Sequence, residues 1–119
     1  MADAHRPNAI LSWEGDSKEV LRGFPVTARS NLSYELFQLE QHRLPQDFRP
    51  MPSIGPKVYE LKDGDEKTWY RLIYLSEIHN MIYVLHCFEK QGARTPRKDL
   101  KTAKKRLSNV HARLRRGEE

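Results

Sequence analysis

The sequence predicts an α+β domain in which helices precede and follow one antiparallel sheet. Two segments rich in β-branched and aromatic residues, Trp69–Leu75 and Met81–Phe88, are joined by only a few residues. Strands joined this closely must pair antiparallel. The segments before position 43 and after Pro96 instead place apolar residues at helical spacing. Helices grouped at both ends of a run of strands are typical of the α+β class.

The N-terminal part is predicted to form a short strand and two helices. Residues 1–8 are polar, and we expect them to be flexible. The apolar run Ala9–Trp13 predicts an additional strand. The segment Asp16–Glu19 opens a short helix, because the helix dipole favours an acidic residue there. Pro25 fits the first turn of a longer helix that reaches to about His42.

This long helix is predicted to bury one face. Leu32, Leu36 and Leu39 are spaced four and three residues apart, so they share a face. Val26 and Phe37 flank that stripe. The aromatic residues that we expect in the core are Trp13, Phe24, Phe37 and Phe88.

The centre of the chain is predicted to be a β-meander. Leu44–Pro56 carries four prolines, a composition that forbids a continuous helix or strand. Lys57–Lys62 is strand-like, and Asp63–Glu66 forms a turn. Glu77–Asn80 turns the chain back after the second strand.

The last helix is predicted to be amphipathic. Thr95 is its expected N-cap and Pro96 its first residue. An apolar stripe that should dock on the sheet consists of Leu100, Ala103, Leu107, Val110 and Leu114. A basic face nearly opposite it consists of Arg94, Lys98, Lys101 and Lys105.

Positive charge is concentrated near the C-terminus. Residues 90–119 hold 11 Lys or Arg against 3 Asp or Glu, a net charge of +8. Residues 1–89 hold 10 against 13, a net charge of −3. Such asymmetry indicates a polyanionic partner, most often nucleic acid or an anionic surface.

Size and composition fit one domain over residues 1–119. No apolar run approaches the about 20 residues that span a bilayer, and the N-terminal segment has no hydrophobic stretch of a secretory signal. Cys87 is the single cysteine, and the five histidines show no zinc-ligand spacing. We therefore expect a cytoplasmic protein with no membrane partner, no metal and no other cofactor.

Arg71 interrupts the apolar strand Tyr70–Tyr74. Burying a guanidinium without an anionic partner costs free energy. One interpretation is that Arg71 lines a concave face and binds a phosphate through its forked donors. The alternative is an internal salt bridge, to Glu60 or Glu89.

A basic loop leads into the last helix, where backbone N–H groups favour anions. The basic residues around it are Lys90, Arg94, Arg97 and Lys98. A solvated basic face is the alternative interpretation. Asp99 is the single acidic residue between Lys90 and Gly117, so pairing along the helix cannot neutralise this face. We therefore expect contact with nucleic acid.

Aromatic residues lie on the strands near Arg71, namely Trp69, Tyr70, Tyr74 and Tyr83. Aromatic rings interleaved with cations can stack RNA bases, although core packing is the commoner role of such rings. His86 is expected to be a hydrogen-bonded structural histidine.

Several short motifs, taken in order, resemble the phage-derived, RelE-like toxins of the HigB group. These motifs are Tyr70–Tyr74, Tyr83–Lys90, Thr95-Pro96, and the helix that contains Asp99, Ala103 and Lys104. The group belongs to the RelE/ParE superfamily of bacterial toxin–antitoxin systems. The resemblance extends over about Met51–Leu107, and the proline-rich Arg49–Gly55 also looks like that group.

The resemblance implies a compact sheet flanked by helices and a metal-independent mRNA endonuclease that acts in the ribosomal A site. It also implies neutralisation by a small antitoxin, often a helix-turn-helix protein in this group. Arg71 matches the superfamily's strand arginine and would stabilise the charge of the phosphorane. Lys90 matches the lysine after the last strand and could stabilise charge or transfer a proton. Lys57 or Lys62 would add a cation, Arg94 would contact a phosphate less directly, and Lys98, Lys101 and Lys105 would attract rRNA.

The chain also departs from the pattern that it resembles. The best-studied RelE-type toxins carry a base-stacking tyrosine near the C-terminus, and no tyrosine follows Tyr83 here. The catalytic histidines and the Asp-Tyr-His tail of some HigB toxins are absent too. The general base is therefore unassigned, and a weak or inactive nuclease is one alternative. Two others are a ParE-type toxin that inhibits DNA gyrase without catalysis and a non-catalytic nucleic-acid-binding module.

Overall fold

The computed structural model describes residues 6–64, 67–92 and 94–117. One strand and two helices precede a run of strands, and a helix closes the chain, which confirms the predicted α+β class. The elements are β1 (Ile10–Trp13), α1 (Ser17–Arg22), α2 (Val26–Glu40), β2 (Phe48–Pro50), β3 (Val58–Gly64), β4 (Trp69–Ile78), β5 (Met81–Lys90) and α3 (Arg97–Arg115).

The strands form one five-stranded mixed sheet in the order β1-β5-β4-β3-β2. The predicted meander is β3, β4 and β5, which pair antiparallel. The predicted N-terminal strand is present as β1, and it pairs parallel to the first half of β5. The proline-rich segment contains a strand that was not predicted, β2, which pairs with β3. Pro50 is tolerated there because β2 is short and lies at the sheet edge.

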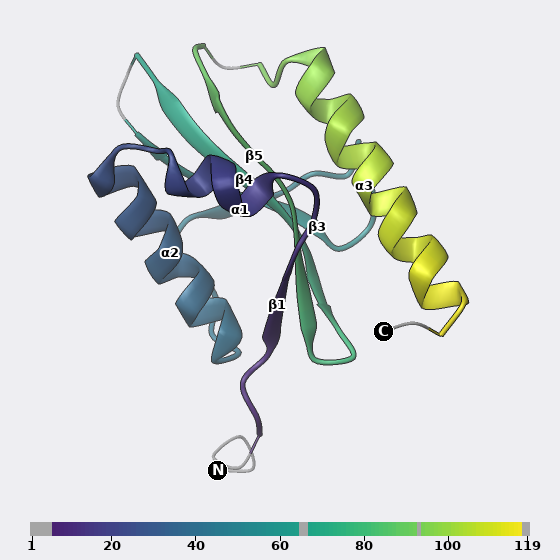
Figure 1. The fold of residues 1–119 in the computed structure, drawn as a ribbon. Coiled ribbons are helices and arrows are strands. Elements are labelled where there is room, and N and C mark those ends of the chain that lie inside the picture. The colour runs from purple at the N-terminus through teal and green to yellow at the C-terminus, as the bar shows by residue number, and fades with distance from the viewer. Residues whose placement is uncertain (1–5, 65–66, 93, 118–119) are drawn as a thin grey trace.

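Helices cover both faces of the sheet (Figure 1): α1 and α2 pack on one face, and α3 packs on the other. The core under α1 and α2 includes Leu21, Leu32 and Leu36 with the strand residues Leu61, Leu72, Tyr74 and Val84. The core under α3 includes Ala103, Leu107 and Val110 with Val58, Ile73, Leu75 and Leu85. No helix in the described ranges is long and apolar enough to cross a bilayer.

The buried stripe of α2 is narrower than the sequence suggested. Leu32 and Leu36 are buried as predicted, and Leu39 packs against the same core. Phe37, which we expected in the core, is 50% exposed, and Val26 is exposed as well. The physical reason is that α2 is a surface layer covered on one side only, so the residue after Leu36, rotated by about 100°, points away from the sheet.

The termini of the helices differ slightly from the predicted ones. Helix α2 ends at Glu40, shortly before the predicted end at His42. Pro96 occupies the cap position of α3, so Arg97 is the first helical residue, one position later than expected. Such shifts are within the ordinary uncertainty of helix boundaries.

Strand β5 contains a bulge at Leu85. Ile73 of β4 pairs with His86, but the next residue, Tyr74, pairs with Val84, so Leu85 is an extra residue on β5. Leu85 packs under α3, and His86 bonds to residues of α3. Both Leu85 and His86 therefore face the same helix. Beyond this point, the residues of β5 that would have faced one side of the sheet face the other side.

The β4–β5 hairpin closes through the two residues His79 and Asn80. Both have positive φ, 52° and 64° respectively. Two consecutive left-handed residues are the signature of the two-residue turn that matches the twist of antiparallel strands.

Candidate active site

Three cationic side chains of the sheet converge on the α3 side near one end of the strands. Arg71 is two residues before Ile73, which packs under α3, so both lie on the same face of β4. Lys62 is the register partner of Arg71 on β3. Lys90 is the partner of Trp69 on β5, and the bulge has turned it to this same face. The structure therefore brings together Arg71, Lys90 and Lys62, three of the predicted site residues.

Glu60 organises these cations. Its Oε1 accepts a hydrogen bond from Nη1 of Arg71 at 2.6 Å and from Nε of Arg49, on β2, at 3.1 Å. The carboxylate is 1% exposed and Arg71 is 4% exposed. The internal salt bridge considered for Arg71 is thus present, with Glu60 as its partner. Glu89 pairs with Tyr70 and does not take that role. We call Arg49, Lys62, Arg71 and Lys90 the cation cluster.

Two atoms of the buried ion pair are left without hydrogen bonds. Nε of Arg71 and Oε2 of Glu60 are inaccessible and find no partner among the described residues. A buried polar atom without a partner costs free energy, so each such atom needs a physical explanation. Arg71 thus donates to Glu60 through Nη1, while its Nε makes no hydrogen bond to the described residues.

Lys90 lies in the field of the other cations. It is 3% exposed, and its Nζ donates a hydrogen bond to Oγ1 of Thr95 at 3.3 Å. Burial lowers the pKa of Lys90, and the neighbouring charge of Arg71 lowers it further. Glu60 opposes this effect on the pKa, while Arg49 and Lys62 add to it. The charge of Arg71 thus acts on Lys90, which lies on the same face of the sheet.

Arg71 remains a cation in this environment. Burial lowers the pKa of its guanidinium, and the charge of Glu60 raises it again. An arginine stays protonated in proteins at any ordinary pH. The site therefore combines one fixed cation, Arg71, with one cation whose proton is held less tightly, Lys90.

Trp69 forms one wall of the cluster. Nζ of Lys62 lies 5.0 Å from its ring centroid, and Cζ of Arg71 lies 5.4 Å from it. Both distances fit cation–π contacts. The indole thus helps to hold the two cationic heads on the α3 side of the sheet.

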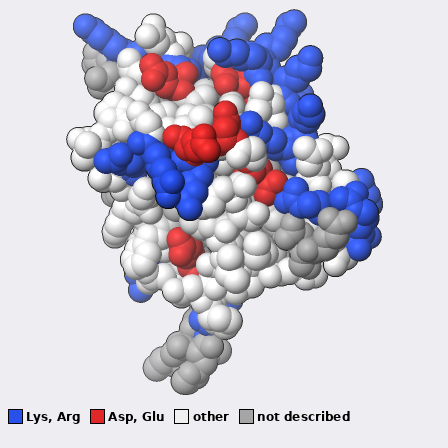
Figure 2. Space-filling view, in the orientation of Figure 1, with Lys and Arg blue, Asp and Glu red and all other residues white. Residues whose placement is uncertain are grey.

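The remaining predicted site residues lie outside this cluster. Lys57 is exposed at the start of β3, the end opposite to Lys62. Arg94 is exposed in the connection to α3. Lys98, Lys101 and Lys105 are exposed on the outer side of α3, and Figure 2 shows Lys and Arg side chains gathered over the N-terminal half of that helix. These residues are exposed and lie apart from the buried Arg71 and Lys90.

Sequence reasoning missed Arg49 as a member of the cluster. Arg49 lies in the proline-rich segment that we expected to be an irregular connection. Its position is set by β2, which pairs Arg49 with Glu60. The available signal for a strand was the position of Arg49-Pro50 shortly before the strand-like segment Lys57–Lys62. The prolines around it argued against a strand.

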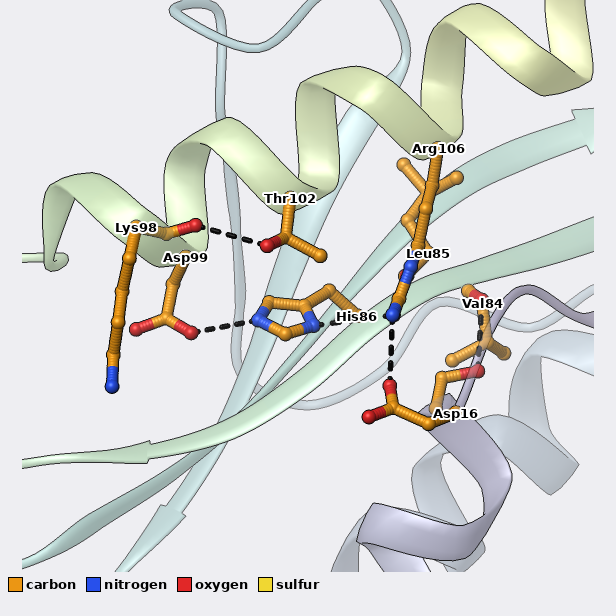
Figure 3. A network of polar contacts seen from close by, with 9 residues as sticks. Asp16, Val84, Leu85, His86, Lys98, Asp99, Thr102 and Arg106 are labelled. Carbon is orange, nitrogen blue, oxygen red and sulfur yellow. Dashed lines mark hydrogen bonds and ion pairs between the residues drawn. The ribbon is translucent and has the colours of Figure 1, made fainter.

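His86 belongs to a separate polar network between β5, α3 and α1 (Figure 3). Its Nε2 lies 2.7 Å from Oδ1 of Asp99, and Nη1 of Arg106 lies 3.3 Å from its Nδ1. Arg106 also donates to the carbonyl of the bulge residue Leu85 at 3.0 Å and to Asp16 at 2.9 Å. The histidine is thus hydrogen-bonded and structural, as its position suggested, and the network joins α3 to the rest of the fold.

Cys87 has the properties of a core residue. Burial raises the pKa of its thiol to about 12, so the thiolate is not available near neutral pH. Within residues 6–64, 67–92 and 94–117, no group of three or more His, Cys, Asp or Glu side chains is arranged to hold a metal ion. The positive charge described at the site is that of Arg and Lys side chains.

The fold is similar to that of a solved toxin structure. The structure of a mutant of the E. coli toxin RelE in the free state matches with a TM-score of 0.61 and 19% identity, covering 84% of this chain and 98% of that chain. The family model described as phage derived protein Gp49-like (DUF891) matches residues 19–108. The chain therefore belongs to the phage-derived Gp49-like family and has a RelE-like fold, as the resemblance predicted. A search of curated proteins finds no match.

Proposed function

We propose that the protein is the toxin of a toxin–antitoxin system and that it cleaves mRNA on the ribosome without a metal ion. The observation that carries the proposal is the convergence of Arg71 and Lys90 on one face of the sheet, around Glu60 and beside Lys62. Membership of the Gp49-like family and the likeness of the fold to the E. coli toxin RelE support the toxin role and the existence of an antitoxin partner. A small helix-turn-helix protein is the partner that we expect.

The chemistry requires fixed positive charge. The 2′-hydroxyl loses its proton to solvent and attacks the adjacent phosphorus, the bond to the 5′-oxygen breaks, and the 5′-oxygen takes up a proton. The products are a 2′,3′-cyclic phosphate and a 5′-hydroxyl. Negative charge builds up on the phosphorane oxygens during this step, and preorganised donors lower its energy. Arg71, held in place by Glu60, would supply fixed positive charge beside these oxygens. Lys90 would stabilise the same charge or give its proton to the leaving 5′-oxygen.

Glu60 would act by positioning. Its carboxylate binds Arg71 and Arg49 at once and so fixes the orientation of both guanidinium groups. A forked donor held in one orientation binds a phosphate better than a mobile one, because less conformational entropy is lost. The surface lysines Lys98, Lys101 and Lys105 would add long-range attraction toward rRNA.

The test is to induce the chain in bacterial cells and to map mRNA 5′ ends across the transcriptome. We expect cuts in phase with codons on translated messages, and we expect Arg71→Ala to abolish them. Lys62→Ala should reduce cutting strongly. Lys57→Ala is the matched control, because it removes an exposed lysine just before the start of the same strand, at the end far from the cluster.

The folded state of each variant should be checked by circular dichroism, because Arg71→Ala leaves Glu60 buried without its cation. Arg71→Lys, which keeps a charge near Glu60 but lacks the fork, should fold and should still cut poorly. Growth arrest with intact mRNA and blocked DNA supercoiling would show a gyrase inhibitor instead. Nucleic-acid binding with neither effect would show a non-catalytic module.

A further inference from the structure

The aromatic residues of the sheet divide sharply between its two faces. Tyr59, Tyr70 and Tyr74 belong to the core cluster under α1 and α2. On the α3 face, Tyr83 is fully buried and Phe88 is 6% exposed and stacked on His86. Trp69 is the remaining sheet aromatic on the α3 face in the described part of the chain, and it is only partly buried.

Trp69 also has the position that a nucleotide subsite requires. It is the first residue of β4, at the end of the sheet where the cation cluster lies. Its register partner on β5 is Lys90, and its ring is contacted by Lys62 and Arg71. A phosphate bound by the cluster would therefore have an indole ring beside it, within one nucleotide of the charge.

We propose that Trp69 is the platform on which one base of the RNA stacks next to the scissile phosphate. The inference rests on the proposed function, since it assigns a subsite to the same RNA. Every base has a π-face, so the platform would bind without strong sequence preference. The flexible head of Lys62 now covers part of the ring; a stacked base would replace it there, and the released ammonium would turn to the phosphate.

The proposal predicts different roles for Trp69 and Arg71, which lie close together on the same strand. Trp69 would hold the base and so fix the distance between phosphate and cluster, while Arg71 would stabilise the charge that forms there. Loss of the indole should therefore weaken RNA binding, whereas loss of Arg71 should mainly affect the cleavage step. This separation makes the two roles distinguishable in one set of variants.

The binding test uses Trp69 as its own reporter. The chain has two tryptophans, and Trp13→Phe removes the other one, which lies on β1. Titration of this variant with a short 2′-O-methyl oligoribonucleotide, which cannot be cleaved, should quench Trp69 fluorescence in a saturable way. Trp69→Leu, followed by anisotropy of a labelled oligonucleotide, should bind about 5- to 100-fold more weakly, and Trp69→Phe should lie in between. Circular dichroism confirms that each variant is folded.

The outcomes separate the platform from the nuclease. Quenching together with weaker binding by Trp69→Leu supports the platform, even if no mRNA is cut, in which case only the proposed function fails. Absence of quenching while Arg71-dependent cutting persists overturns the platform and leaves the proposed function intact. Equal affinity of the wild type and Trp69→Leu, at any level of cutting, also overturns it.

Discussion

At the scale of single residues, the two interpretations of Arg71 turn out to be compatible. A buried salt bridge and a phosphate contact seemed to be alternatives, because each satisfies the guanidinium. In the fold, Glu60 takes one nitrogen of Arg71 and leaves Nε without a partner. Removing one member of such a buried pair typically costs about 3–5 kcal/mol, so the pair is also a constraint on stability. The ion pair fixes the cation that the chemistry would use.

Lys90 predicts a specific dependence of activity on pH. Burial and the charge of Arg71 lower its pKa from the ordinary lysine value. Cleavage that needs the ammonium should fall as pH rises through this lowered pKa. In Lys90→Arg the charge persists, so the decline at alkaline pH should disappear from a single-turnover pH profile. An unchanged alkaline decline in Lys90→Arg would assign it to another group.

The same shift has a consequence for stability. Because the folded pKa of Lys90 is below the unfolded one, the folded state loses its proton first as pH rises. The free energy of unfolding contributed by Lys90 should therefore increase with pH between the lowered pKa and the ordinary value of about 10.4. Urea titrations across this range should show the increase in the wild type and a flatter dependence in Lys90→Arg.

At the scale of elements, the bulge in β5 determines whether Lys90 lies on the same face of the sheet as Arg71. Tyr83 and Leu85 face α3, and strict alternation would continue to Cys87 and Glu89. Lys90 would then lie on the opposite face from Arg71. The extra residue reverses this, so Phe88 and Lys90 face α3 instead. Apolar residues occupy both faces of this strand, so its sequence carries no signal for the bulge.

The sequence predicted the features that depend on neighbouring residues, but not those that depend on pairing between distant segments. Local patterns identified the meander, the helices and the odd position of Arg71, because each depends on near neighbours in sequence. The convergence of Arg71 with Lys90 and the addition of Arg49 depend on a bulge and on a short edge strand, which are set by pairing between segments. The exposed Phe37 has the same origin, since only the packed fold shows how wide the buried face of α2 is.

The stability of helix α3 should depend on a single carboxylate in its first turn, that of Asp99. Asp99 is buried, bonds to His86, and lies where the helix dipole favours a negative charge. We expect Asp99→Asn to lower the free energy of unfolding by about 1–2 kcal/mol in urea titrations. Lys101→Ala, an exposed change in the same helix, should stay within about 0.5 kcal/mol. Equal effects of the two substitutions would show that the Asp99–His86 contact does not anchor α3.

At the scale of the whole molecule, positive charge lies in two separate places. Arg71 and Lys90 of the cation cluster are buried, whereas the outer side of α3 presents Lys98, Lys101 and Lys105 to solvent. Figure 2 shows basic groups gathered over α3 and acidic groups nearer to the middle of that view. The buried cations suit short-range chemistry, and the exposed ones suit long-range attraction that salt can screen.

Replacing the three surface lysines by glutamine should therefore affect affinity and its salt dependence together. The slope of log affinity against log salt for single-stranded RNA should become shallower by about 2, because each phosphate contact contributes about 0.7. A control with the same loss of charge elsewhere, in Lys18, Arg43 and Lys57, should keep the wild-type slope. Equal slopes for both triple variants would argue against a binding face on α3.

The parallel pairing of β1 with β5 also has a consequence for the order of folding. Ile10 pairs with Met81, far away in the chain, whereas β4 and β5 meet across the turn of His79 and Asn80. Closing the longer loop costs more entropy, so the hairpin should form in the transition state and β1 should dock afterwards. Leu11→Ala should then speed unfolding and leave refolding nearly unchanged in stopped-flow chevrons, whereas Ile73→Val should slow refolding. Until β1 docks, the edge of β5 that it covers would stay open to other strands, which makes this late step the point at which a newly made chain is most exposed to aggregation.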